Sequence, residues 1–189
     1  MNQETIKYAK RIDKLTGSAI REIFKYANVP GLISFAGGNP GKFALPVELV
    51  AQISHDLMLK KGNELLQYGQ TEGYLPLRES LIPYLTKTFG VNAKLSEVLI
   101  TTGSMQGFDL MLKSLINPGD AVLTESPAFL GALQAMNAYE ANIISVKSDS
   151  QGIDIDHLQE MMKRHHPKLL YIIPTFQNPT GISLSLERR

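Results

Sequence analysis

The sequence predicts an α/β fold in which a mainly parallel sheet carries helices on both faces. The first observation is an alternation of short apolar runs with amphipathic segments from residue 98 onward. The second is an ordinary globular composition, with 43% hydrophobic and 20% charged residues. The third is the length of 189 residues, which at about 150 residues per domain allows one or two domains and a sizeable core.

The alternation begins after a first half that is richer in helical and loop signals. The apolar runs, expected to be strands, span residues 98–101, 121–123, 142–146 and 168–173. Helices are expected between or after them, over residues 104–116, 128–138 and 155–165. Strands that alternate with helices form parallel sheets, whose ligand sites lie beyond the carboxyl ends of the strands.

The first half has its own order of elements. Residues 4–27 have the three- and four-residue apolar spacing of a helical arm, which residues 28–31 end. A short extended piece, 32–36, leads into a loop rich in glycine. Pro46 opens the next helix, a polar loop follows at 67–73, and a further helix is expected to be bent or interrupted at Pro83.

Composition and charge disfavour several classes of protein. A formal charge of +1 gives no field that would attract nucleic acid. The absence of cysteine removes disulfides, thiolate nucleophiles and cysteine zinc sites, and the four histidines do not form a ligand set, so no metal site is expected. No apolar stretch is long enough to span a membrane, and the first residues lack a signal-peptide pattern. A cytoplasmic protein is therefore expected.

Three strand ends carry candidate binding residues, each with a plain structural alternative. A glycine turn leads into a helix at Gly103 and Ser104, where the helix N-terminus could bind phosphate or Ser104 could simply cap the helix. Phe129 could stack on a planar ring or belong to the core. Asn178, in a turn-rich stretch, could present its amide to a ligand or close an Asx-turn.

Together, these motifs resemble the fold type I aminotransferases, which use pyridoxal 5′-phosphate. The similarity is greatest to the branch of 2-aminoadipate, kynurenine and aromatic aminotransferases, whose catalytic domain also occurs in MocR-type regulators. It extends from about Arg21 to the last residue. The motifs are Asn178-Pro179-Thr180-Gly181, Thr102-Gly103-Ser104, the 67–73 loop Gln-Tyr-Gly-Gln-Thr-Glu-Gly, Ile-Ser-Phe-Ala-Gly-Gly at 33–38 and Asn-Pro-Gly-Asp at 117–120.

The resemblance implies roles for individual residues. Gly103, Ser104 and the N–H group of Met105 would hold the cofactor phosphate, with Met105 in place of a frequent glutamine. Phe129, where tyrosine is usual, would stack on the pyridine ring, and Asn178 would contact the phenolic oxygen. Tyr68 would reach the phosphate of the other subunit of a homodimer. The positions implied to lie near the substrate are Arg21, Gly38 and Asn178.

The resemblance also implies that part of the machinery lies outside these residues. In this family the Schiff-base lysine, the acidic partner of the pyridine nitrogen and an arginine for the substrate carboxylate all follow the Asn-Pro-Thr-Gly motif. The chain is therefore expected to be the N-terminal portion of an aminotransferase acting on an amino acid and a 2-oxo acid, and to be inactive alone. We expect an arm and the start of a small domain over 1–45 and part of the large cofactor-binding domain over 46–189.

The end of the chain supports the same expectation. Residues 183–189 have the pattern of a helix start, with Glu187 near its positive end, and the predicted sheet ends with an open edge. Two alternatives remain: the effector-binding domain of a MocR-type transcription regulator, and a non-catalytic fragment that acts as a folding or dimerisation partner. The sequence does not specify the amino-acid substrate.

Overall fold

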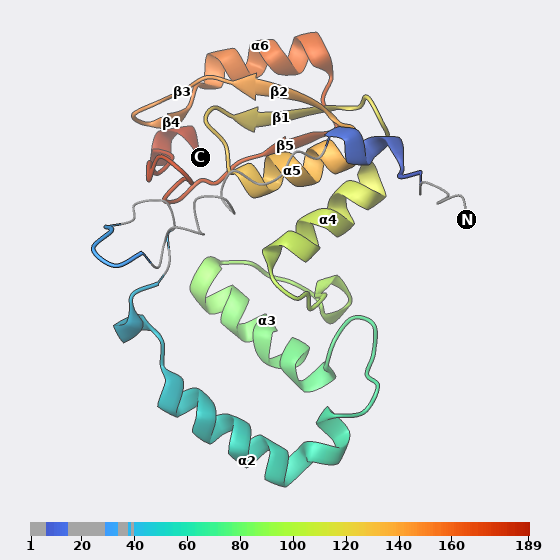
Figure 1. Ribbon diagram of the computed structural model, residues 1–189, viewed down its shortest axis with the longest axis vertical. Coiled ribbons are helices and arrows are strands. Elements are labelled where there is room, and N and C mark those ends of the chain that lie inside the picture. The colour runs from blue at the N-terminus through green and yellow to red at the C-terminus, as the bar shows by residue number, and fades with distance from the viewer. Residues whose placement is uncertain (1–6, 15–28, 34–37, 39) are drawn as a thin grey trace. The chain divides into compact units, whose positions relative to one another are not determined.

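The computed structural model describes residues 7–14, 29–33, 38 and 40–189, which fall into two compact units (Figure 1). The first unit comprises residues 1–16 and 102–189, and the second comprises residues 17–101. This division differs from the boundary between residues 45 and 46 that the sequence suggests, and that domain assignment stays a prediction.

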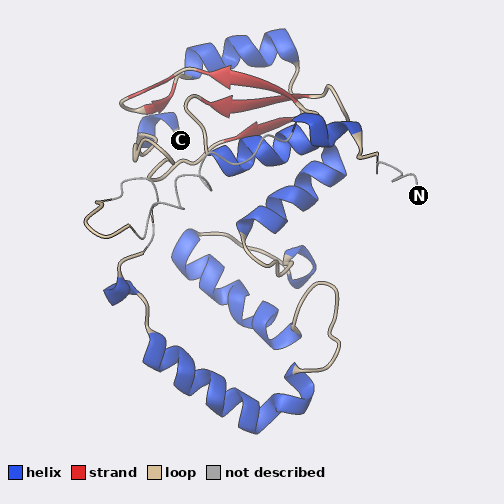
Figure 2. Cartoon of the chain, in the orientation of Figure 1, coloured by secondary structure: helices blue, strands red, loops and turns tan. Residues whose placement is uncertain are grey.

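The first unit is built on a three-stranded parallel sheet (Figure 2). Its strands are β1 (Ala121–Glu125), β2 (Asn142–Val146) and β5 (Leu169–Tyr171), in the order β2-β1-β5. Leu123 of the central strand lies opposite Ile144 on one side and Leu170 on the other. The predicted α/β class with a parallel sheet is confirmed.

Successive residues of β1 point to opposite faces of the sheet. Apolar side chains are therefore present on both faces, and helices cover each of them. On one face, Val122 packs with α4 (Ser104–Leu115) and α5 (Leu130–Ala138). On the other face, Leu123 packs with α6 (Ile155–His165). The buried residues of the first cluster are Leu112, Ile116, Val122, Ala132 and Met136, and those of the second are Leu123, Val146, Ile153 and Met161.

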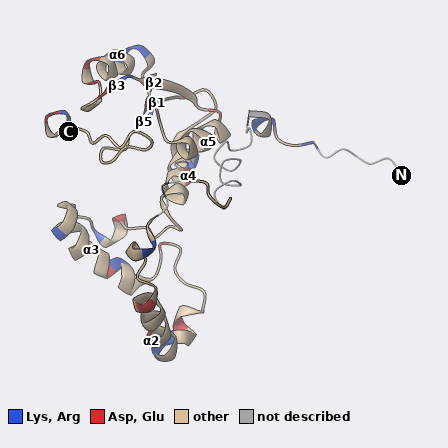
Figure 3. Ribbon diagram, turned by 60° about the vertical axis from the view of Figure 1, so that its left-hand side comes forward, with Lys and Arg blue, Asp and Glu red and all other residues tan. Residues whose placement is uncertain are grey.

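A short hairpin leads from the sheet into α6. It pairs β3 (Ser148–Asp149) with β4 (Gly152–Ile153). The Asp154 carboxylate then caps α6 by accepting the N–H of His157 at 3.0 Å. An acidic residue in the first turn and basic residues in the last turn follow the dipole of α6 (Figure 3).

The last residues of the chain pack on the same hairpin. Instead of the predicted helix start, they form a 3₁₀ turn, η4 (Leu186–Arg188). The guanidinium of Arg188 forms two 2.8 Å contacts with the Asp149 carboxylate and donates to the Gly152 carbonyl. Among the described residues of the arm, only η1 (Lys10–Lys14) is helical, as a 3₁₀ helix, whereas Lys7–Ala9 are not helical and the remainder lies outside the described residues.

The second unit consists of helices and loops in its described part. Its elements are η2 (Lys42–Ala44), α2 (Val47–Leu65), α3 (Leu75–Phe89) and η3 (Leu95–Glu97). Pro46 is the N-cap of α2, and Gly90 ends α3 with a φ of 69°. The predicted interruption at Pro83 is wrong: α3 runs through it, because Pro83 lies on an exposed face where water can bond the freed carbonyl.

The apolar run at 98–101 is not a strand, contrary to the sequence prediction. A strand needs a neighbour to pair with, and within the described residues the parallel sheet contains only β2, β1 and β5. The backbone here bonds to other groups instead: the N–H of Ile100 donates to the Glu72 carbonyl, and the Val98 carbonyl accepts from Arg78.

Across the described ranges, no helix combines the length and apolar character that crossing a membrane requires.

Candidate functional site

The first candidate element is the N-terminus of α4. Its N-cap is Gly103, whose φ of +92° suits glycine, so the alternative in which Ser104 caps the helix is wrong. Within the described part of the chain, no atom lies within 4 Å of the place that a Cβ at Gly103 would occupy. Ser104 and Met105 are exposed in the first turn. The Gln106 side chain turns back to accept both the N–H and the hydroxyl of Thr102.

An aromatic contact joins α4 to the carboxyl end of β5. The ring of Phe108, in the second turn of α4, lies 4.9 Å from that of Tyr171, with 49° between the ring planes. Tyr171 is the last residue of β5. Burial and the nearby Glu125 carboxylate raise the pKa of the Tyr171 hydroxyl. The beginning of α4 is therefore held near the edge of the sheet where the sequence predicts ligand binding.

Phe129, the second candidate, lies just before α5 as its N-cap. It is half-buried and packs against the core cluster between α4, α5 and β1, so part of its ring contacts the core, and its stacking on a cofactor ring stays a prediction. A Cβ at Gly131 would lie 2.6 Å from the Phe129 ring. The ring therefore folds over the first turn of α5, and a larger residue at position 131 would require the ring to move.

Asn178, the third candidate, lies in the loop that follows β5. The Asx-turn expected as an alternative is not what closes this loop, because the acceptor is the neighbouring Gln177. The Oε1 atom of Gln177 accepts the N–H of Thr180 at 3.0 Å and its hydroxyl at 2.7 Å. The Asn178 side chain is exposed, and no hydrogen bond is recorded for it within the part of the chain that the structure describes.

The loops after β1 and β5 are joined by groups that sequence reasoning missed. Gln177 Nε2 donates to the Pro127 carbonyl at 2.8 Å. The buried Glu125 carboxylate accepts the N–H of Ile173. Burial raises the pKa of Glu125, and the hydrogen bonds from Ile173 and Gln177 oppose this shift. The available sequence signal for Glu125 was a carboxylate directly after an apolar run, whereas nothing local marked Gln177.

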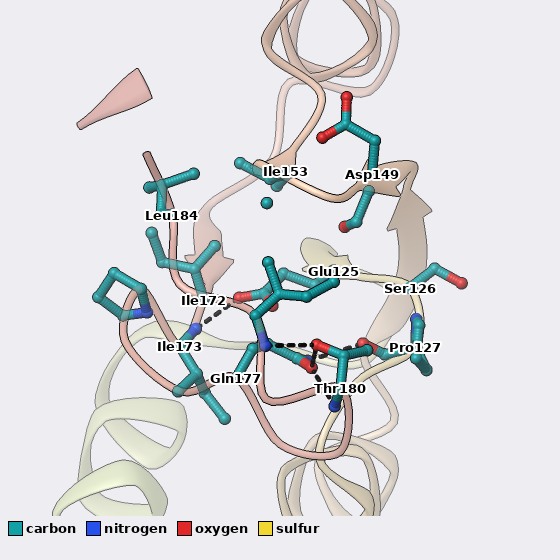
Figure 4. Close-up of a pocket in the computed structure, with 14 residues that line it drawn as sticks. Glu125, Ser126, Pro127, Asp149, Ile153, Ile172, Ile173, Gln177, Thr180 and Leu184 are labelled. Atoms are coloured by element: carbon teal, nitrogen blue, oxygen red, sulfur yellow. Dashed lines mark hydrogen bonds between the residues drawn. The ribbon is translucent and has the colours of Figure 1, made fainter. Parts of the chain in front are cut away.

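A cavity of about 110 Å³ opens beside these loops (Figure 4). Glu125, Gln177 and Thr180 line it together with apolar side chains that include Ile153 and Leu184. None of the described candidate residues from the sequence lines this cavity. The exposed Asn178 side chain and the start of α4 therefore lie outside this cavity.

The remaining candidates lie apart from these three in the chain. Tyr68 and Gly38 belong to the second unit, and both are exposed, Tyr68 completely. The Tyr68 N–H donates to the side chain of Gln67. Arg21 lies outside the described residues. The structure thus brings together Gly103, Ser104, Met105, Phe129 and Asn178 in one unit, but does not relate Tyr68, Gly38 or Arg21 to them.

Comparisons with known proteins give consistent matches. The 2-aminoadipate transaminase of Thermus thermophilus is 41% identical over 174 residues, which cover 92% of this chain and 42% of the relative. Aromatic-amino-acid aminotransferase 1 of Thermococcus litoralis is 34% identical, covering 98% of this chain and 46% of the relative. The chain therefore spans less than half the length of these curated relatives.

Solved structures show the same similarity. A kynurenine aminotransferase of Pyrococcus horikoshii, solved in complex with PMP, matches with a TM-score of 0.86 and 36% identity, over 96% of this chain and 46% of the other. An α-aminoadipate aminotransferase of Thermus thermophilus matches with a TM-score of 0.84 and 38% identity, over 96% and 44%. The sequence profile of the family "Aminotransferase class I and II" matches residues 31–188, so the chain belongs to this family.

Proposed function

We propose that this chain supplies part of the pyridoxal 5′-phosphate site of an aminotransferase that transfers an amino group between an amino acid and a 2-oxo acid. The supporting observation is that one compact unit contains all three binding elements. These are a helix whose first turn is exposed, a half-buried aromatic ring and an exposed asparagine. Family membership makes pyridoxal 5′-phosphate the cofactor that this set would serve.

The α4 N-terminus has the donors that a phosphate requires. The positive φ of Gly103 turns the chain sharply into the helix, and no described atom lies within 4 Å of the place that a Cβ there would occupy. The N–H groups of Ser104 and Met105, the Ser104 hydroxyl and the helix dipole all favour a dianion here. Because the backbone of Met105 is the proposed donor, the absence of glutamine at this position removes only a side-chain contact.

The ring of the cofactor would lie between the loops after β1 and β5. Phe129 would cover the ring and exclude water from one face, and the Asn178 amide would donate to the phenolic oxygen. The bound cofactor would supply an electron sink for the carbanion formed when the substrate loses its α-proton. In this proposal Asn178 also contributes to substrate binding, together with Arg21 and Gly38.

The proposal includes a homodimer in which Tyr68 reaches the phosphate bound by the other subunit. Two features support it. Tyr68 is fully exposed, and the apolar side chains of α2, including Ile53 and Leu57, are about half exposed in the single chain. Such an exposed apolar surface is unusual for a monomer, and a second copy would cover it. We also propose that the protein is cytoplasmic, where free amino acids and 2-oxo acids are metabolised.

One relative favours a second candidate function. An uncharacterised HTH-type transcriptional regulator, YdfD of Bacillus subtilis, is 29% identical over 174 residues, covering 90% of this chain and 35% of the relative. On this alternative, the same cofactor site would sense an effector. Amino transfer from amino acids to 2-oxo acids by the protein at its native length would support the enzyme, whereas effector-dependent DNA binding without turnover would support the regulator.

The proposal can be tested on the 189-residue chain by equilibrium dialysis with pyridoxamine 5′-phosphate, which has no aldehyde to react with surface lysines. We expect saturable binding that inorganic phosphate competes away. Ser104→Asp should weaken it at least about tenfold, because its charge repels phosphate while suiting a helix N-terminus. Gln159→Glu adds the same charge on α6, at the other face of the sheet, and should bind normally.

Two outcomes would contradict this function. One is the absence of saturable binding by the wild-type chain, and the other is equal binding by Ser104→Asp. We also expect that pyridoxal 5′-phosphate followed by borohydride traps no single lysine and that the chain alone gives no turnover. A specific trapped lysine with turnover would overturn the expectation that these 189 residues are inactive alone.

A further inference from the structure

Gln177 is the most fully bonded residue of the loop after β5. Its side chain is buried, with 6% of its surface exposed. Its N–H donates to the Ile182 carbonyl at 2.8 Å, and its own carbonyl accepts from Gly181. Its Oε1 atom accepts both donors of Thr180. Gln177 therefore fixes the curvature of the segment that contains Asn178.

The Nε2 atom of Gln177 extends this order to a different loop. It donates to the carbonyl of Pro127, a residue 50 positions away in the sequence. Pro127 belongs to the short segment between β1 and α5, two residues before Phe129. One amide thus ties the Asn178 loop to the Phe129 loop (Figure 4).

Glu125 supports this amide from the end of β1. Its carboxylate is buried and accepts the N–H of Ile173, and the Gln177 side chain is near enough to act against the rise of its pKa. Ile173 lies two residues beyond the last residue of β5, so this bond holds the two strands together past the end of their ladder. The base of the Asn178 loop is therefore fixed where the loop begins.

The adjacent residues Gln177 and Asn178 have different environments. Gln177 is buried and its polar groups are engaged, whereas Asn178 is exposed with a side chain that can receive a ligand. We propose that Gln177 is a positioning residue that joins the Asn178 and Phe129 loops, with Glu125 as its support, so that both sides of the cofactor ring are recognised as a unit. This inference rests on the proposed function and goes beyond the residues assigned there.

The experiment measures ligand binding and loop exchange on the 189-residue chain. Gln177→Met keeps the side-chain volume and removes both the Nε2 donor to Pro127 and the Oε1 acceptor of Thr180. The matched control is Gln151→Met, since Gln151 is exposed in the β3–β4 turn. We expect pyridoxamine 5′-phosphate to bind about tenfold more weakly to Gln177→Met, from the loss of buried hydrogen bonds, and normally to Gln151→Met. When inorganic phosphate competes with this binding, the affinity for phosphate should be the same in both variants as in the wild type.

A double-mutant cycle separates positioning from simple destabilisation. If Gln177 acts through Asn178, Gln177→Met should weaken binding much less in an Asn178→Ala background than in the wild type. Amide hydrogen exchange without ligand should become faster in Gln177→Met at residues 126–129 as well as 174–184. A merely structural role would instead speed exchange throughout the first unit and leave the two substitutions additive.

The outcomes distinguish this inference from the function on which it rests. If the wild-type chain does not bind pyridoxamine 5′-phosphate, the proposed function is wrong and this inference falls with it. If the wild type binds, but Gln177→Met binds equally well, shows additive effects with Asn178→Ala or leaves exchange at 126–129 unchanged, the inference alone is wrong.

Discussion

The two units differ in how far their helices bury apolar side chains. In the sheet unit, each of α4, α5 and α6 buries at least one side chain, and every buried apolar residue of the described ranges lies between positions 112 and 161. In the helical unit, α2 buries none, although its apolar stripe is regular. The stripe residues Leu49, Val50, Ile53, Leu57 and Met58 are each 44–56% exposed.

This difference shows that an amphipathic pattern predicts a helix but not its burial. A helix buries its stripe only where another apolar surface faces it, and β1 supplies such a surface on both of its faces. Among the described residues of the helical unit, the one buried side chain is charged: Arg78, 6% exposed, donates to the carbonyls of Val98 and Leu95 at 2.9 and 2.6 Å. That unit is organised by polar contacts.

The largest expected effect tests this contrast with matched truncations. Leu123→Ala empties a fully buried position of the sheet unit and should lower the free energy of unfolding of that unit by about 3–4 kcal/mol. Ile53→Ala, at a position 48% exposed, should cost about 1 kcal/mol or less. Hydrogen exchange gives the local free energy in each unit. Equal losses would mean that the units do not differ in the way described.

The next effect tests the polar organisation of the helical unit. Arg78→Met keeps an apolar stem but leaves two partly buried carbonyls without their donor, and should cost about 2 kcal/mol in that unit. Lys87→Met, on the same helix, is the control. Proteolysis or hydrogen exchange at residues 95–98 should report the loss. An unchanged 95–98 segment would show that Arg78 does not organise it.

A smaller effect is expected at the start of α6. Asp154→Ala removes the acceptor of the His157 N–H and should cost about 1 kcal/mol, whereas Asp154→Asn, which keeps a capping oxygen, should cost less. Urea unfolding followed by circular dichroism measures both. Equal losses in the two variants would point to charge rather than capping as the cause.

The smallest expected effect is a change in pH dependence at Glu125. Burial raises its pKa in the folded state, so ionisation opposes folding, and the stability it contributes is lost as pH rises through the raised value. Glu125→Gln cannot ionise and retains an acceptor for Ile173. Its stability relative to wild type should therefore rise between the ordinary carboxyl pKa of 4.5 and neutral pH. Glu160→Gln, at an exposed position, is the matched control.

Local patterns predict the parts of this fold that local interactions determine. Residues 155–165 are predicted as a helix and form α6 with the same bounds, because Asp154 and His166 mark its ends. The run 142–146 likewise forms β2 as expected. By contrast, 98–101 has strand composition but no strand to pair with among the described residues, and pairing is a long-range property.

The same limit applies to the site. A helix-opening glycine at 103 and the loop residue Asn178 carry recognisable local signals, which made them candidates. Gln177 and Glu125 carry out their bonding with residues 50 and 48 positions away, so their roles exist only in the folded chain. The local signal at Phe129 does not separate its two possible roles, because a core position and a proposed ring contact have the same sequence signal.

In the proposed function, the first unit holds the cofactor at the carboxyl edge of its sheet. The most direct test is a titration of the isotopically labelled 189-residue chain with pyridoxamine 5′-phosphate, followed by backbone amide NMR. We predict saturable shifts at Ser104 and Met105, at Phe129 and at Asn178, at one common ligand concentration. Saturable shifts confined to the cavity of Ile153 and Leu184, or the absence of shifts at these four residues, would contradict it.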